Sequence, residues 1–252
     1  MQREELERYL DETLQARDFD DSSLNGLQVE GAAEIHRVAL AVSACAAAFR
    51  QAVAVGAQAL IVHHGLLWRS TPPAPIRGML AARLRLLLEN DLNLFAYHLP
   101  LDAHPELGHS AVALRYLGGE LLQPFGLYHG RAIGWRATLP RAVARGDFVA
   151  RLEQYYEHPA ILVPGGPPMI RTVGLLSGGA AREAEQAADL GLDLYVTGEA
   201  SEPTTYLCRE WGLNFAALGH YATERVGIKA LAERLQQELG LEVRYLELEN
   251  PA

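Results

Sequence analysis

Histidines and carboxylates occur in short motifs, and these motifs are the part of the sequence that could carry out chemistry. They comprise one pair of adjacent histidines and two histidines that are each followed four residues later by a carboxylate: His63–His64, His98 with Asp102, and His220 with Glu224. All follow apolar runs, which places them at the carboxyl ends of expected strands, where α/β sheets bind ligands. Imidazole nitrogens and carboxylate oxygens suit zinc, manganese and iron. We therefore predict a site for divalent metal ions.

Each motif also has a simpler explanation that the sequence leaves open. The adjacent histidines could lie in a solvated loop, because neighbouring side chains of a strand point to opposite faces and reach one site only if the strand has ended. Asp102 could cap a helix that begins near Pro105. The helix that carries Glu224 could begin after Thr223, which would leave His220 in a loop.

The segments beside these motifs add two expectations. Glu199 ends a further apolar run, and it either supports the site or caps a helix that starts after Pro203. Pro100 and Pro105 interrupt the segment that follows His98, so we expect a fixed, irregular loop there and not a continuous helix. Polar groups on such a stiff loop suit a binding site.

An internal repeat accounts for the positions of the motifs. Residues 37–65 read as a strand, an alanine-rich helix and a short apolar strand, and residues 171–199 repeat this order. His64 then falls opposite Glu199, and the strand that follows in each repeat ends in a histidine with a carboxylate four residues later. Strands that alternate with helices predict an α/β fold, in which two similar domains derived by duplication carry mostly parallel sheets with right-handed crossovers.

The expected domains are residues 1–122 and residues 123–252. The second begins with residues 123–168, where glycine and proline surround a possible strand at 131–139 and a helix at 142–156. The first domain would supply the adjacent histidines and the aspartate, and the second would supply the histidine and glutamate of the last motif.

Composition disfavours several classes of function. The 252 residues include 22 lysines and arginines against 31 aspartates and glutamates, and the net charge of -9 disfavours binding to nucleic acid. Lys229 is the only lysine, which leaves P-loop and Schiff-base chemistry almost no candidate. No apolar run reaches the roughly 18 residues of a membrane helix. Cys45 and Cys208 lie far apart without a partner motif, which is typical of a cytoplasmic protein.

Five segments carry a resemblance to a known family: DSSLNGLQVEG at 21–31, IVHHGLLW at 61–68, YHLPLDAHPELG at 97–108, VTGE at 196–199 and GHYATERVGIKAL at 219–231. Together and in this order they resemble the GTP cyclohydrolase I type 2 homologue family, also called the NIF-three-like dinuclear-metal-centre proteins. The match spans nearly the whole chain. It is similar to the short form of the family, without the domain that longer members insert between the halves.

The resemblance implies a two-domain α/β fold and a hexameric ring in which pairs of divalent metal ions face the cavity. Glu224 is expected to bridge the two ions, and five residues match the family's ligands: His63, His64, Asp102, His220 and Glu224. His98 and Glu199 match positions near the centre. Where the family often has two adjacent asparagines, this sequence has His109 and Ser110.

These observations predict a dinuclear, metal-dependent hydrolase of a nucleotide-like or phosphorylated small molecule. Two neighbouring divalent ions lower the pKa of a shared water and polarise the bond that it attacks. His98 or Glu199 would then carry the proton. The alternative is a metal-binding carrier or scaffold ring without turnover. An open coordination position beside a base favours the enzyme, and a closed site without a pocket favours the carrier.

Overall fold

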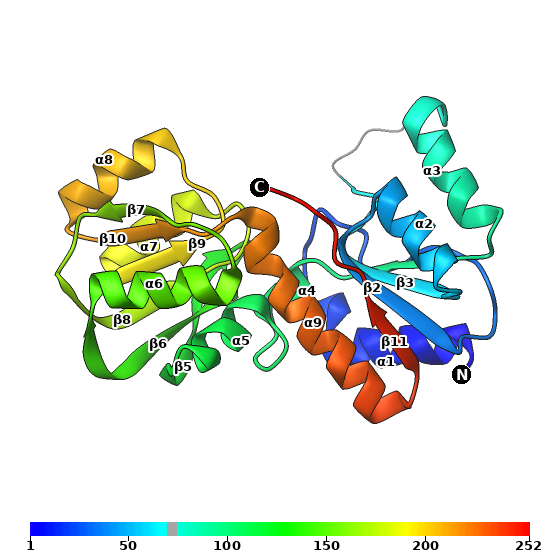
Figure 1. Cartoon of the computed structure of the whole chain (residues 1–252), viewed down its shortest axis with the longest axis horizontal. Helices are drawn as coiled ribbons and strands as arrows, with labels where there is room; N and C mark the ends of the chain where they lie inside the picture. The colour runs from blue at the N-terminus through cyan, green and yellow to red at the C-terminus, as the bar shows by residue number, and fades with distance from the viewer. Residues whose placement is uncertain (70–74) are drawn as a thin grey trace. The chain divides into compact units, whose positions relative to one another are not determined.

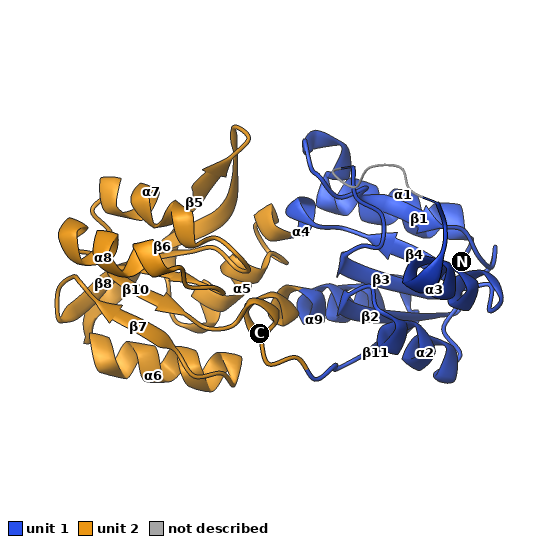
Figure 2. Cartoon of the chain, turned by 90° about the horizontal axis from the view of Figure 1, so that it is seen from above, with its two compact units in different colours: residues 1–101, 228–249 blue, residues 102–227, 250–252 orange. Residues whose placement is uncertain are grey.

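The computed structural model describes residues 1–69 and 75–252, and the chain forms two compact units (Figure 2). Unit 1 consists of Met1–Leu101 and Ile228–Glu249, and unit 2 consists of Asp102–Gly227 and Asn250–Ala252. The units differ in extent from the two sequence halves, because residues 102–122 belong to unit 2 and the late segment returns to unit 1. The division into domains of residues 1–122 and 123–252, which the internal repeat predicts, stays a prediction.

Unit 1 is built on a largely parallel sheet. Its strands follow one another across the sheet in the order β1 (Gly26–Val29), β4 (Asn93–Ala96), β3 (Ala59–His64), β2 (Arg37–Ser43) and β11 (Glu242–Tyr245). β1 runs antiparallel to β4, and the other neighbours are parallel. β2 and β3 are buried along almost their whole length, which is typical of parallel strands covered on both faces.

Helices cover both faces of this sheet (Figure 1). The helices of unit 1 are α1 (Arg3–Leu14) with the short η1 (Ala16–Asp18), α2 (Ala46–Ala54), α3 (Gly78–Leu88) and the later turns of α9 (His220–Leu239). α1 buries Leu6, Leu10 and Leu14, whose four-residue spacing forms one apolar stripe. The hydroxyl of Tyr9 on α1 donates to Glu238 on α9 at 2.6 Å, so these two helices are neighbours. Within residues 1–69 and 75–252, no helix combines the length and apolar character needed to cross a membrane.

Unit 2 is built on a mixed sheet. Its strands follow one another in the order β5 (Glu120–Tyr128), β6 (Arg131–Ala144), β8 (Met169–Leu175), β9 (Leu194–Thr197), β10 (Asn214–Ala217) and β7 (Ile161–Pro164). Its helices are α5 (His109–Tyr116), α6 (Arg145–Tyr156), α7 (Ala184–Asp189) after η2 (Ala181–Glu183), α8 (Glu202–Trp211) and the first turns of α9.

The two-unit α/β fold is confirmed, and two of its details are corrected. Only β8, β9 and β10 are mutually parallel in the second sheet, because a long antiparallel hairpin of β5 and β6 joins one edge and antiparallel β7 joins the other. The strand expected at 131–139 extends to Ala144, since its last residues pair with Met169 and Ile170 of β8. The helix expected at 142–156 therefore begins at Arg145.

The same arrangement of strands recurs in both units. In unit 1 the order β1, β4, β3, β2 has one antiparallel strand beside three parallel ones, and in unit 2 the order β7, β10, β9, β8 has the same directions. In each case the antiparallel strand precedes the three parallel strands along the chain. The topology agrees with the internal repeat in the sequence, and it places β3 opposite β9 and β4 opposite β10.

Candidate metal centre

β3 ends in two adjacent histidines at the carboxyl edge of the unit 1 sheet. β3 pairs with β4 as far as Val62, which lies opposite Ala96, whereas His64 still pairs with Ser43 of β2. The last residues of β3 therefore have a neighbouring strand on one side only. The third histidine of this unit, His98, follows the end of β4 by two residues.

The imidazole rings of His63, His64 and His98 converge on one another. The ring centroids of His63 and His64 are 4.7 Å apart, those of His63 and His98 are 4.9 Å apart, and those of His64 and His98 are 5.7 Å apart. One ligand nitrogen from each lies within 4.8 Å of the others. β3 ends at His64, directly before Gly65, and it loses its β4 partner after Val62, as the sharing of one site by adjacent histidines requires. The solvated-loop explanation is wrong, because His63 is fully buried.

Each of these rings has a hydrogen-bond partner for Nδ1. The Nδ1 atom of His63 donates to the carbonyl oxygen of Tyr97 at 3.1 Å, and Nδ1 of His64 lies 3.1 Å from Oγ of Ser43. Nδ1 of His98 lies 2.9 Å from a carboxylate oxygen of Asp21. Partners of this kind fix the orientation of a metal-binding imidazole and leave Nε2 as the nitrogen that can serve as ligand.

Asp21 is a buried carboxylate that sequence reasoning left without a role. It accepts hydrogen bonds from the backbone amides of Ser23 and Leu99 and from the side chain of Asn25, each at 3.0 Å. Burial raises the pKa of the Asp21 carboxyl, but the hydrogen bond and charge of His98, together with the donors Ser23 and Asn25, outweigh burial and lower the pKa to about 2. An ionised carboxylate only accepts hydrogen bonds, so the proton of His98 resides on Nδ1.

The second group of predicted residues lies in unit 2, at the start of α9. α9 begins at His220, so His220 and Glu224 lie one turn apart and the alternative start after Thr223 is wrong. The Nδ1 atom of His220 lies 2.6 Å from Oε1 of Glu199, and its Nε2 atom lies 3.1 Å from Oε1 of Glu224. The residue before α8 is Ser201, so Glu199 does not cap that helix.

The two carboxylates make His220 a strong base. The hydrogen bond to Glu224 is the largest cause, burial acts in the opposite direction, and Glu199 adds a further hydrogen bond and charge, so that the pKa of His220 is raised to about 9. Glu224 is only 3% exposed, and a buried carboxylate is costly unless it is paired or bound to a cation. This place therefore favours a positive charge, which a proton or a metal ion can supply.

The stretch Ser177–Gly179 packs against this second group. Gly178 has a φ of +67°, and a Cβ atom at this position would collide with Oε1 of Glu224. Its amide also donates to Oγ1 of Thr223 at 3.1 Å. The two glycines are visible in the sequence, but the stretch matches no known nucleotide-binding or catalytic motif. Only the structure shows that glycine is needed at residue 178 so that the backbone can approach Glu224.

Asp102 lies in α4 (Leu99–Ala103), where an irregular loop was expected. Pro100 is tolerated because it occupies the first turn of this short helix, whose amide groups have no helical acceptor. The N-cap of the next helix is Gly108, so Asp102 does not cap it. Asp102 is 7% exposed, and its Oδ1 atom accepts a hydrogen bond from Oγ of Ser177 at 3.0 Å.

His109, which follows the Gly108 N-cap, also faces Asp102. The backbone amide of Gly227 donates to Nδ1 of His109 at 3.1 Å, so the proton of a neutral His109 is on Nε2. That Nε2 atom lies 3.9 Å from Oδ1 of Asp102. The ring is fully buried, and no local pattern in the sequence distinguishes it from an ordinary core residue.

The structure thus brings the predicted residues together in three places. Unit 1 unites His63, His64 and His98, and unit 2 unites His220 with Glu224 and Glu199, while Asp102 lies with Ser177 and His109. The donors are imidazole nitrogens and carboxylate oxygens throughout. This set fits a divalent ion of borderline or hard character and does not resemble the thiolate sites that select softer ions.

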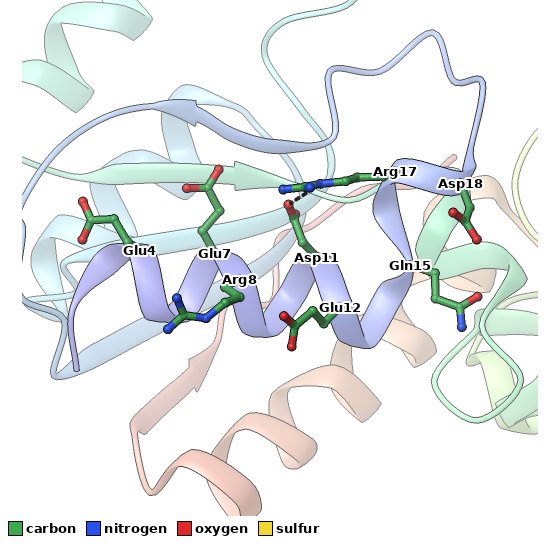
Figure 3. Close-up of a pocket in the computed structure, with 8 residues that line it drawn as sticks. All are labelled: Glu4, Glu7, Arg8, Asp11, Glu12, Gln15, Arg17 and Asp18. Carbon is green, nitrogen blue, oxygen red and sulfur yellow. Dashed lines mark ion pairs between the residues drawn. The ribbon is translucent and has the colours of Figure 1, made fainter.

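A separate hollow lies along α1 and η1 (Figure 3). It has a volume of about 740 Å³ and is lined by charged and polar side chains: Glu4, Glu7, Arg8, Asp11, Glu12, Gln15, Arg17 and Asp18. Arg17 and Asp11 form a long ion pair of 3.9 Å across it. None of the residues predicted from the sequence to bind metal lines this hollow.

Comparison with known proteins agrees with this architecture. A protein of Pasteurella multocida (strain Pm70) named GTP cyclohydrolase 1 type 2 homolog is 44% identical over 250 residues, which cover 98% of each chain. A protein of the same name from Archaeoglobus fulgidus is 41% identical over 244 residues, which cover 97% of each chain. Both relatives match the chain from end to end.

Solved structures show the same fold. The protein TTHA1606 from Thermus thermophilus superposes with a TM-score of 0.92 at 39% identity, and a protein called ybgI, of unknown function, superposes with a TM-score of 0.94 at 38% identity; both comparisons cover 100% of each chain. The family model of Duf34/NIF3 (NGG1p interacting factor 3) matches residues 1–251. The chain belongs to the Duf34/NIF3 family.

Proposed function

We propose that the chain is a metal-dependent hydrolase that binds two divalent ions and acts on a nucleotide-like or phosphorylated small molecule. The observation that carries the proposal is the convergence of His63, His64 and His98, whose ligand nitrogens lie within 4.8 Å of one another. Histidines that converge in this way repel one another when protonated, and a shared cation stabilises them in the unprotonated form. The name of the relatives, GTP cyclohydrolase 1 type 2 homolog, supports a nucleotide-like substrate.

The proposed ligands are those that the family resemblance implies. They supply nitrogen and oxygen donors: His63, His64, Asp102, His220 and Glu224. The resemblance assigns Glu224 to both ions, and the burial of its carboxylate supports a role as an anionic ligand. When bound, zinc, manganese or iron would polarise the substrate and lower the pKa of a water.

His98 and Glu199 are the proposed groups that move protons. Asp21 holds the proton of His98 on Nδ1, so Nε2 can accept a proton, and the ionised carboxylate would then stabilise the imidazolium. Glu199 holds Nδ1 of His220 through a side chain that is 56% exposed, so water can reach its carboxylate. His98 would therefore act as a partly buried base at the site, and Glu199 would connect the site to solvent.

The test joins metal analysis to a turnover screen. Protein purified without added metal is analysed for its metals, then loaded with manganese, iron or zinc and assayed on nucleotides and phosphoesters. We expect about two ions per chain and measurable hydrolysis. Bound metal without turnover of any substrate would favour the carrier or scaffold ring, and a chain that holds no metal after loading would refute the proposal.

Assembly and location complete the proposed function. We expect six chains per particle from the family resemblance, with a small molecule as the other partner and no nucleic acid. A cytoplasmic location follows from the cysteine usage and stays a prediction. Neither property is needed for the metal chemistry of a single chain, so the metal test above is independent of them.

A further inference from the structure

The segment at 21–28 contacts both pieces of chain that carry the histidines of unit 1. At its start, Asp21 accepts hydrogen bonds from Nδ1 of His98 at 2.9 Å and from the amide of Leu99 at 3.0 Å. Asn25 donates to Asp21 at 3.0 Å and accepts from the backbone amide of His98 at 2.8 Å. These two side chains therefore fix both the ring and the backbone of His98.

At the other end of the segment, Gln28 fixes the chain that follows His64. Its Oε1 atom accepts from the amides of Leu66 and Leu67 at 2.7 and 2.9 Å, and its Nε2 atom donates to the carbonyl oxygen of Leu67 at 2.9 Å. A Cβ atom on Gly65 would collide with this amide group. The turn after His64 is thus shaped around Gln28.

Backbone pairing between the segment and this turn extends to an aromatic neighbour of the histidines. The amide of Leu24 donates to the carbonyl oxygen of Leu67 at 3.2 Å, and Ser23 forms a bridge with Trp68. The Trp68 ring lies edge-on to His98 with the ring centroids 5.2 Å apart. The segment thereby sets the position of a ring that packs against His98.

We propose that Asp21, Asn25 and Gln28 are positioning residues: Gln28 aims the adjacent histidines of β3 at a metal ion, and Asp21 and Asn25 aim the base His98 at the same place. This inference rests on the proposed function, because it gives the three side chains a purpose only if His63 and His64 bind a metal ion beside His98. Groups that orient metal-binding imidazoles commonly change metal affinity by 10- to 100-fold when removed. A purely structural role would change stability and leave affinity in the folded protein unaltered.

Gln58 offers a matched control for Gln28. Its Oε1 atom also accepts from two consecutive amides, those of His36 and Arg37 at 3.0 and 2.9 Å, and its Nε2 atom donates to a carbonyl oxygen, that of Gly56, at 2.9 Å. It lies at the amino end of β3, away from the histidines. Gln28→Met and Gln58→Met therefore each remove a side chain that holds two consecutive amides, at opposite ends of β3. Gln28 makes one further bond, from Nε2 to the carbonyl oxygen of Leu24 at 2.8 Å.

Asp21→Asn tests the positioning of His98 by itself, and it keeps the proposal testable through the His98 ring if Gln28→Met folds poorly. Oδ1 of Asp21 accepts from the amide of Ser23 and Oδ2 accepts from that of Leu99, so an asparagine turns its NH₂ group toward a backbone donor in either orientation. Asp193→Asn is its control, because Asp193 accepts the amides of Arg171 and Thr172 at 2.8 Å in unit 2.

The experiment titrates each purified variant with Co²⁺ and follows the visible absorption bands, with urea unfolding as a check that the protein is folded. We expect Gln28→Met to weaken cobalt binding on the order of 10- to 100-fold and to alter the bands. Asp21→Asn should keep cobalt binding, because Asp21 holds His98 and not one of the proposed ligands. Gln58→Met and Asp193→Asn should bind cobalt like the wild type. Unaltered binding in Gln28→Met, or equal weakening in Gln58→Met, overturns the proposal.

A metal-free measurement separates this inference from the proposed function. Nitrogen NMR of histidine-labelled protein reports which ring nitrogen of His98 carries the proton, with His98→Gln used to assign the signal. The wild type should hold it on Nδ1, and Asp21→Asn should lose that preference. If the wild type binds no cobalt, the proposed function fails, and an unchanged tautomer in Asp21→Asn would also overturn the positioning role.

Discussion

Replacement of Glu224 by glutamine removes one negative charge beside His220 and keeps the volume of the side chain. Oε1 of Glu224 lies 3.1 Å from Nε2 of His220, and this contact is the largest cause of the raised pKa of His220. In the metal-free variant we expect that pKa to fall from about 9 toward 6.5. The free energy of unfolding should fall with it, because the folded protein no longer holds the imidazolium as tightly.

The size of the effect follows from the pKa. A rise from 6.5 to about 9 corresponds to roughly 3 kcal/mol, at about 1.4 kcal/mol for each pH unit. Part of this comes from Glu199, and the His220 side chain is 30% exposed, so water screens some of the interaction. We therefore expect Glu224→Gln to lower the free energy of unfolding by about 2 kcal/mol.

The free energy of unfolding lost in Glu224→Gln should decrease as the pH rises. Since folding raises the pKa of His220, the stabilisation is fully present below the unfolded value of 6.5 and disappears as the pH rises through about 9. Urea unfolding in the presence of a chelator, at about pH 6 and about pH 10, should show a difference of about 2 kcal/mol at the lower pH and almost none at the higher. Metal analysis of the loaded proteins should show fewer ions in the variant.

Glu233→Gln is the control, because it removes the same charge from an exposed position of α9. It should change the free energy of unfolding by less than about 0.5 kcal/mol and leave the metal content unchanged. A loss of equal size at both pH values in Glu224→Gln would show that Glu224 acts through packing and not through its charge. Full metal content in that variant would remove Glu224 from the proposed ligands.

Three further predictions concern the base, the glycine turn and the assembly. His98→Gln should keep its metal and lower kcat by a factor on the order of 10² to 10⁴ if His98 is the base; metal loss would make it a ligand. Gly178→Ala should lower the free energy of unfolding by about 1–3 kcal/mol and weaken metal binding, because its φ is +67° and its Cβ meets Glu224, and wild-type values in both measurements would contradict this. Light scattering on a sizing column should give about six chains per particle, and a monomer at micromolar concentration would refute the hexamer.

The sequence predicts the frame well where patterns are local. Alternating apolar runs and helices indicate the repeated unit, and the histidines fall at strand ends because ligand groups at the carboxyl edge follow buried strands directly. The helical start at His220 accords with the spacing of four between His220 and Glu224, which places both residues on one face of α9. These features depend on residues close together in the chain.

Features that depend on distant residues could not be predicted in this way. Asp21 lies 77 residues from His98, and nothing in the loop around it indicates which side chain it will meet. The antiparallel strands of unit 2 pair through registers that no periodicity reveals, and the short helix around Pro100 is permitted only because the proline occupies its first turn. Tertiary contacts decide all three.

His98 and His220 occupy equivalent positions in the two repeats, but their surroundings give them different chemistry. His98 follows β4 and His220 follows β10, and each has Nδ1 on a carboxylate. For His98 that carboxylate is the buried Asp21, which leaves Nε2 to accept a proton or bind a metal. For His220 a second carboxylate, Glu224, faces Nε2 as well, so metal binding there must displace a proton held with a pKa of about 9. Metal uptake at His220 should therefore release a proton at neutral pH.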